Sequence, residues 1–262
     1  MNDRDLFRDW FGDGPKPDPM RSAQKNMRPV LPKRFFKQAG VTERDGLFAV
    51  TLDGRVARTP GKALLAVAAE PLAQAMAAEW QALTHEIDPQ HLPITRIVNS
   101  AIDGVAREMA AVAAEIVTYS GSDLLCYRAG EPPELARRQS EAWDPVLAWA
   151  RSALGAHFVS TTGIVHVTQA EEAKAAVARA LADFDAIALA ALSTVTTLSG
   201  STLLALALAH RHLEPEAAWA AAHVDEDYQI ELWGHDEEAQ LRRAGRWREM
   251  EAAARILRLT RG

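Results

Sequence analysis

The longest uncharged stretch of the chain runs from Ala186 to Ala209 and constrains the fold more than any other feature. Its 24 residues contain no Asp, Glu, Lys or Arg, which is long enough for a helix to cross a bilayer. Its centre, however, is rich in Ser and Thr where a spanning helix normally carries Leu, Ile or Phe. We therefore expect two buried core helices, or one interrupted helix with a break near Ser199 to Ser201, and no stable membrane insertion.

Composition places the rest of the chain among globular proteins. Hydrophobic residues make up 48% and charged residues 24% of the 262 residues, close to globular averages. The net charge of -6 opposes binding to nucleic acid or anionic lipid. A single cysteine, Cys126, cannot form an internal disulfide or a thiolate zinc site. Because the first residues also lack the apolar core of a secretory signal, we expect a cytoplasmic protein.

Hydrophobic periodicity divides the chain into a β-rich part and a helical part. Alternation predicts strands at residues 34–38, 47–52, 55–58 and 63–67, with a hairpin turn at Asp53-Gly54. Helical spacing begins at Glu70 and predicts further helices at 94–119, 134–154, 170–184, 215–233 and 236–259. The predicted fold is α+β, with a flexible tail (1–27), a small antiparallel β-rich domain (28–95) and a larger all-helical domain (96–262).

The sequence patterns of common catalytic sites are absent. A P-loop ending at Gly61-Lys62 would need glycine at Val56 and Ser or Thr at Ala63. The glycine pair near the N-terminus lacks its third glycine, because Pro17 stands there. No histidine pair has the spacing of a zinc protease helix, and no Gly-x-Ser-x-Gly elbow occurs. We predict no catalytic, cofactor-binding or metal-binding residues.

The most unusual segment is the acidic sequence from Asp225 to Glu231. If residues 215–233 form one helix, Glu226 falls on an apolar stripe with Trp219, Ile230 and Trp233, while Asp227 and Glu231 share a solvated face. One interpretation is an exposed helix face with Glu226 satisfied by an internal arginine. The other is an acidic recognition surface for a protein partner, with Asp225, Glu226, Asp227, Tyr228 and Glu231 as the client-binding residues.

Nine short motifs occur along the chain in one order. They are Phe35-Phe36, Leu52-Asp-Gly54, Thr59-Pro60, Glu79-Trp80, Leu92-Pro-Ile-Thr95, Ala101-Ile-Asp103, Asp123-Leu-Leu-Cys-Tyr-Arg128, Trp143-Asp-Pro145 with Trp149, and Asp225-Glu-Asp-Tyr-Gln229 with Trp233-Gly234. In this order they resemble a known family, the assembly chaperones of the F-type ATP synthase that bind the unassembled alpha subunit. The resemblance implies a β-rich N-terminal domain, a helical C-terminal domain, no catalysis and no nucleotide consumption. It also implies a functionally important acidic position that aligns best with Asp225.

Two hypotheses follow from these observations. The favoured one is a chaperone that shields the subunit interface of the alpha subunit until the beta subunit replaces it. The alternative is an enzyme whose site is assembled from Asp103, Asp123 and Asp225 with a histidine. Eukaryotic members of the family have extra residues after the position of Gly234, so the resemblance favours a bacterial member. We expect a monomer in the cytoplasm, for which the mitochondrial matrix is the equivalent compartment in eukaryotic relatives.

Overall fold

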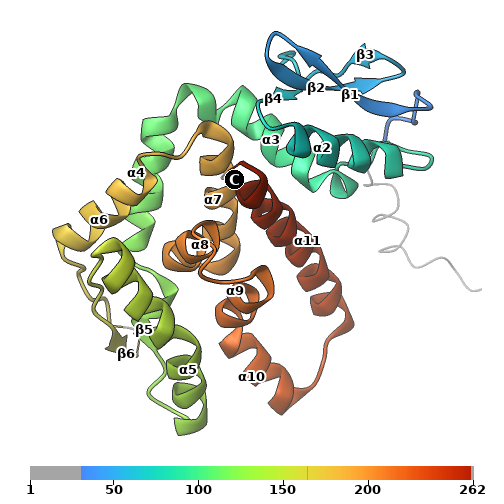
Figure 1. Cartoon of the computed structure of the whole chain (residues 1–262). Helices are drawn as coiled ribbons and strands as arrows, with labels where there is room; N and C mark the ends of the chain where they lie inside the picture. Colours follow the sequence, from blue (N-terminus) through green and yellow to red (C-terminus); the bar gives the residue numbers. More distant parts are fainter. Residues whose placement is uncertain (1–30, 164, 261–262) are drawn as a thin grey trace, which may run out of the picture.

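The computed structural model describes residues 31–163 and 165–260, and within them an antiparallel sheet precedes ten α-helices (Figure 1). The sheet consists of β1 (Ala39–Arg44), β2 (Leu47–Leu52), β3 (Arg55–Val56) and β4 (Ala66–Val67). The helices are α2 (Glu70–Ala82), α3 (Pro93–Asp103), α4 (Met109–Ser120), α5 (Pro133–Trp149), α6 (Glu171–Leu181), α7 (Ala186–Ser199), α8 (Thr202–Ala209), α9 (Pro215–Ala222), α10 (Val224–Trp233) and α11 (Glu237–Thr260). The α+β prediction is confirmed. The proposed domain boundary near residue 95 stays a prediction.

The sheet is built around β2, which pairs with each of the other three strands. The predicted turn at Asp53-Gly54 is confirmed, with φ of +48° and +78° at its two residues. The predicted strand at residues 34–38 is wrong, because the first strand is β1, which reaches β2 through a second turn at Asp45-Gly46. The backbone N–H groups of Lys37 and Gln38 donate to the Asp53 carboxylate instead of to a neighbouring strand.

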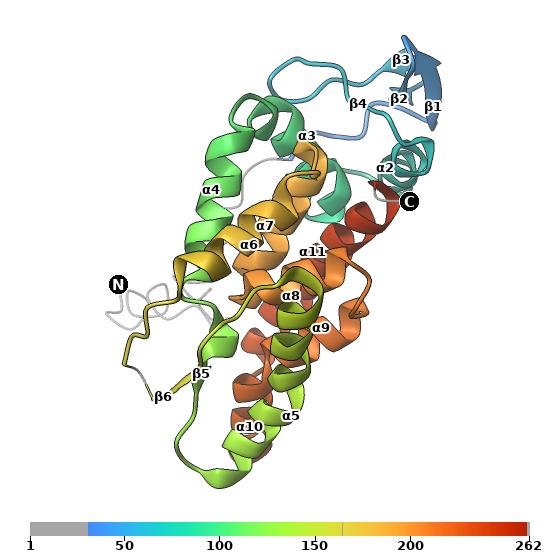
Figure 2. The ribbon, with the colours of Figure 1, turned by 60° about the vertical axis from the view of Figure 1, so that its left-hand side comes forward.

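The uncharged stretch forms α7 and α8 at the centre of the helical part, with the predicted break in place. Gly200 ends α7 at φ +72°, and the Ser201 hydroxyl accepts a hydrogen bond from the backbone N–H of Leu204 at the start of α8. Every residue of α8 is buried. Helices α3, α4, α8 and α11 pack against α7, and α4, α5, α9 and α11 pack against α8 (Figures 1 and 2). Within the described residues, no helix combines the length and the hydropathy needed to span a membrane.

Two of the predicted helices are each divided in two. The segment 94–119 breaks at Gly104, where α3 ends and a short 3-10 turn leads to α4. The segment 215–233 breaks at His223, which separates α9 from α10. Because of this second break, the angular positions expected for one continuous helix do not relate the residues of α9 to those of α10.

Two short strands, β5 (Tyr127–Arg128) and β6 (Thr161–Thr162), pair in parallel beside α5. The main sheet lies at the other end of the molecule, with α2 packed against β1 and β2 (Figure 1). Helix α11 runs back from α10 to the region of α2 and α3, so it contacts both the central helices and α2, the helix that packs against the sheet.

Candidate protein-binding site

Three carboxylates outside α10 accept hydrogen bonds that join separate elements of the fold. Asp103 accepts hydrogen bonds from the Thr59 hydroxyl at 2.6 Å and the Gly61 backbone N–H at 2.8 Å, which connects the loop after β3 to the end of α3. Glu79 of α2 accepts from the backbone N–H groups of Ile94 and Thr95 at 2.7 and 2.9 Å. Glu79 therefore satisfies the free donors at the first turn of α3.

The third carboxylate, Asp123, is completely buried beside the first turn of α8. It accepts hydrogen bonds from the Ser201 hydroxyl at 2.7 Å, from the Leu203 N–H at 3.0 Å and from the Leu125 N–H at 3.1 Å. Burial raises the pKa of Asp123 to about 6, and these hydrogen bonds oppose the increase. Burial also raises the pKa of the neighbouring Cys126 thiol to about 12, so this cysteine is not a reactive thiolate at neutral pH.

Asp103, Asp123 and Asp225 therefore do not form one site. Each has hydrogen-bond partners that the other two do not share, and Asp225 lies on a different helix beside α5. Among the residues in the described ranges, no group of three or more His, Cys, Asp or Glu side chains is arranged to hold a metal ion.

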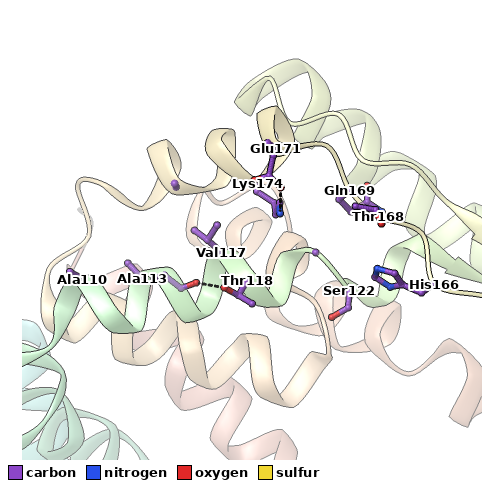
Figure 3. A pocket seen from close by; sticks show the side chains of 13 residues that line it. Ala110, Ala113, Val117, Thr118, Ser122, His166, Thr168, Gln169, Glu171 and Lys174 are labelled. Carbon is purple, nitrogen blue, oxygen red and sulfur yellow. Dashed lines mark hydrogen bonds and ion pairs between the residues drawn. The ribbon is translucent and has the colours of Figure 1, made fainter.

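A surface cavity of about 730 Å³ lies between α4 and α6 (Figure 3). Its two oppositely charged groups pair with each other, because Lys174 Nζ lies 2.6 Å from Glu171 Oε1. His166 at its edge makes a hydrogen bond of 3.1 Å with the Tyr127 hydroxyl. None of the residues predicted from the sequence lines this cavity, and its described lining contains neither a carboxylate pair nor a cysteine.

The predicted client-binding residues lie on α10, at the end of the molecule opposite the sheet (Figure 1). The side chains of α10 contact both α5 and α11. None of the ten residues of α10 is buried. Asp225 at its start accepts a hydrogen bond of 2.7 Å from the side-chain amide of Gln139 in α5. Gln139 is buried and its own carbonyl oxygen accepts from the backbone N–H of Ala129. Asp225 therefore satisfies a buried amide while remaining exposed itself.

Arg138 of α5 holds the opposite half of α10. Its guanidinium lies 2.8 Å from Glu231 Oε1 and 5.3 Å from the centre of the Tyr228 ring, and it also pairs with Glu134 on its own helix. The hydrogen bond from Arg138 lowers the pKa of Glu231. These contacts keep the Glu231 carboxylate ionised and fix its position on the surface.

The predicted apolar stripe that contains Glu226 is wrong in two respects. Trp219 lies on α9, beyond the break at His223, so it is not on the same helix as Glu226. Glu226, Ile230 and Trp233 do share one face of α10, but this face is not buried, because the Glu226 side chain is 40% exposed and Trp233 is 81% exposed. Glu226 lies 3.7 Å from His223 Nε2 and 3.9 Å from Arg243 Nη1.

Arg243 of α11 also pairs closely with Asp227. Burial lowers the pKa of His223, so this histidine is neutral at neutral pH and its contact with Glu226 is not an ion pair. The internal arginine of the first interpretation is therefore present, but its close partner is Asp227. Among the described residues, one oxygen of each of three carboxylates makes the contact with α5 or α11, namely in Asp225, Asp227 and Glu231.

Sequence reasoning missed the residues that hold α10 in place. Gln139, Arg138 and Arg243 come from α5 and α11, and nothing in the acidic segment indicates which distant residues would meet it. The acidic segment itself was detectable, because four of the seven residues from Asp225 to Glu231 are acidic.

Comparisons with known proteins give a consistent set of relatives. A family model described as ATP12 chaperone protein matches residues 33–151. The crystal structure of Atp12 from Paracoccus denitrificans is 41% identical, with 87% of this chain and 98% of that chain covered and a TM-score of 0.81. The structure of the Atu1473 protein from Agrobacterium tumefaciens is 48% identical over 93% and 92% of the two chains, with a TM-score of 0.85. The mitochondrial protein atp12 of Schizosaccharomyces pombe is 26% identical over 79% of this chain and 75% of its own length.

Proposed function

The chain belongs to the ATP12 chaperone protein family, and we propose that it binds the unassembled alpha subunit of the F-type ATP synthase until the beta subunit replaces it. Membership makes it an assembly chaperone for the ATP synthase and a non-enzymatic factor. The alternative hypothesis of an enzyme is therefore wrong. The identity of the client subunit and the surface that binds it are parts of our proposal.

The observation that carries the choice of surface is that the acidic residues of α10 lie on an accessible helix even though three of them pair with α5 and α11. Glu79, Asp103 and Asp123 are used in hydrogen bonds that join elements of the fold. The acidic motif of α10 instead lies on a helix with no buried residue. A fold gains little from four carboxylates at such an exposed position, because surface ion pairs contribute about 0–1 kcal/mol each. We therefore assign α10 to client binding.

In this proposal, Asp225, Glu226, Asp227 and Glu231 present carboxylate oxygens to cationic side chains of the client, and Tyr228 adds a polar aromatic surface. Polar contacts at an exposed surface guide the encounter of two proteins and are readily reversed. Reversibility suits a chaperone that a beta subunit must replace without nucleotide hydrolysis. The contacts with Gln139, Arg138 and Arg243 keep the carboxylates in position before the client arrives.

We further propose that the chain acts as a monomer in the bacterial cytoplasm. The bacterial compartment is supported by the greater similarity of the chain to the two bacterial proteins than to the mitochondrial relative. The absence of the extra residues after Gly234 agrees with this proposal.

Neutralising α10 is expected to weaken binding of the alpha subunit about tenfold, from three exposed charge pairs of about 0.2–1 kcal/mol each. The test variant combines Asp225→Asn, Asp227→Asn and Glu231→Gln. Asparagine at position 225 retains a carbonyl oxygen for the Gln139 amide, whereas Asp225→Lys would leave that buried amide unsatisfied. The affinity is measured from the binding of purified alpha subunit to the immobilised chain at two salt concentrations. The loss of affinity in the variant should be larger at low salt.

A matched control removes the same number of negative charges elsewhere, through Glu43→Gln, Glu70→Gln and Glu172→Gln on β1, α2 and α6. These residues are exposed, and the control should bind the client within about twofold of the wild type. Equal affinity of the α10 variant and the wild type would exclude α10 from binding without affecting the family assignment. Equal losses in both variants would show a dependence on net charge alone.

A further inference from the structure

Three large apolar side chains are exposed around the turn between α10 and α11. Leu232 is 57%, Trp233 81% and Leu241 75% exposed, and we call these three residues the apolar tip. Trp233 is the last residue of α10, and the turn follows at Gly234, whose φ is +87°. Isolated exposed leucines are common on protein surfaces, whereas several large apolar residues at one turn indicate an interaction site.

The charges of the same segment restrict what can cover the apolar tip. Residues 225–243 contain seven carboxylates and two arginines, a net of five negative charges in a chain whose total is -6. Anionic lipid and nucleic acid are repelled by such a segment. A second copy of this chain would bring the same negative charges together, which also disfavours association. A protein surface with apolar residues beside arginine or lysine complements both features.

We propose that the apolar tip is the anchor through which the chain holds its client, and that it covers an apolar segment of the alpha subunit flanked by arginine or lysine. This inference rests on the proposed function. The carboxylates of α10 guide the basic residues of the client, and Trp233 with the two leucines supplies the contact that excludes water. Tryptophan is enriched among the residues that dominate binding energies at protein interfaces.

The test uses the full chain with Leu232→Gln, Trp233→Gln and Leu241→Gln combined. Glutamine removes the apolar surface and retains a favourable helix propensity. Because the three side chains are exposed, the thermal midpoint should change by less than about 2 °C. The dissociation constant for purified alpha subunit should increase about thirtyfold, mainly through faster dissociation. The control is Phe35→Gln, an aromatic residue that is 74% exposed before β1, and it should leave the affinity within about twofold.

The possible results separate this inference from the proposed function. If the combined variant binds the alpha subunit as tightly as the wild type, the apolar tip is not the anchor for the client, and the proposed function is unaffected. A wild-type chain that does not bind the alpha subunit overturns both. Two other results would also contradict the inference. The wild type could bind vesicles of phosphatidylcholine and phosphatidylserine, or it could form a dimer in sedimentation. Either result contradicts the inference if the combined variant no longer shows that binding or that dimer. A loss of affinity in the combined variant alone supports the assignment.

Discussion

Replacing Trp143 with alanine should lower the free energy of unfolding by about 3–5 kcal/mol. Trp143 is 1% exposed in α5, and its indole N–H donates to the backbone carbonyl of Ala221 at 2.7 Å, which joins α5 to α9. The Arg128 guanidinium lies 5.0 Å from the centre of its ring. Alanine would leave a cavity, an unpaired carbonyl group and an arginine without its aromatic partner. Since small domains are stable by only about 5–15 kcal/mol, the variant should be close to unfolding.

Urea unfolding followed by circular dichroism measures the effect. Trp143→Phe serves as the matched control, because it retains one aromatic ring and removes the N–H donor together with the second ring of the indole. Its expected loss is smaller, about 1–3 kcal/mol. If Trp143→Ala unfolds at the same urea concentration as the wild type, the α5–α9 junction does not contribute to the stability of the core as we describe it.

The buried carboxyl of Asp123 should make the protein less stable as the pH rises. Its pKa is raised to about 6 from an ordinary value of 3.8, mainly by burial. The folded state therefore favours the protonated acid, so the contribution of this group is complete below about pH 4 and is lost as the pH rises through about 6. The pKa difference corresponds to about 3 kcal/mol. This carboxyl is completely buried, so screening by solvent does not reduce the effect.

Asp123→Asn isolates this contribution from other titrating groups, because asparagine has nearly the same shape and no charge. The free energy of unfolding of the wild type minus that of the variant is measured by urea unfolding between pH 4.5 and 7.5. We expect this difference to decrease as the pH rises to about 6 and then to remain constant. An increase over the same interval would show that the three hydrogen bonds stabilise the ionised form more than burial opposes it.

Local signals in the sequence were sufficient for the elements that depend on neighbouring residues. The turn at Asp53-Gly54 was predictable because two residues with positive φ favour Asp-Gly. The break near Ser199–Ser201 was predictable because glycine and serine end and begin helices. Strand β1 was misplaced because its sequence, from Ala39 to Arg44, has little hydrophobic alternation and its residues are only partly buried.

Contacts between distant segments were not predictable from the sequence. Glu79 satisfies the first turn of α3, and Asp103 holds the loop at Gly61, but their sequence positions give no indication of these partners. The same limitation explains the error at Glu226. The stripe depended on one continuous helix, whereas His223 is buried at a break and its ring Nδ1–H donates a hydrogen bond of 2.8 Å to the Trp219 carbonyl. The acidic segment was found from composition, but the direction of its side chains depends on α5 and α11.

The most direct test of the account follows the alpha subunit from the chaperone to the beta subunit. The full chain is immobilised, loaded with purified alpha subunit and washed, and then purified beta subunit is added without nucleotide. We predict that the alpha subunit is retained during the wash and released by the beta subunit, with both subunits recovered together in solution. A chain that retains no alpha subunit, or that retains it unchanged when excess beta subunit is present, would contradict the account.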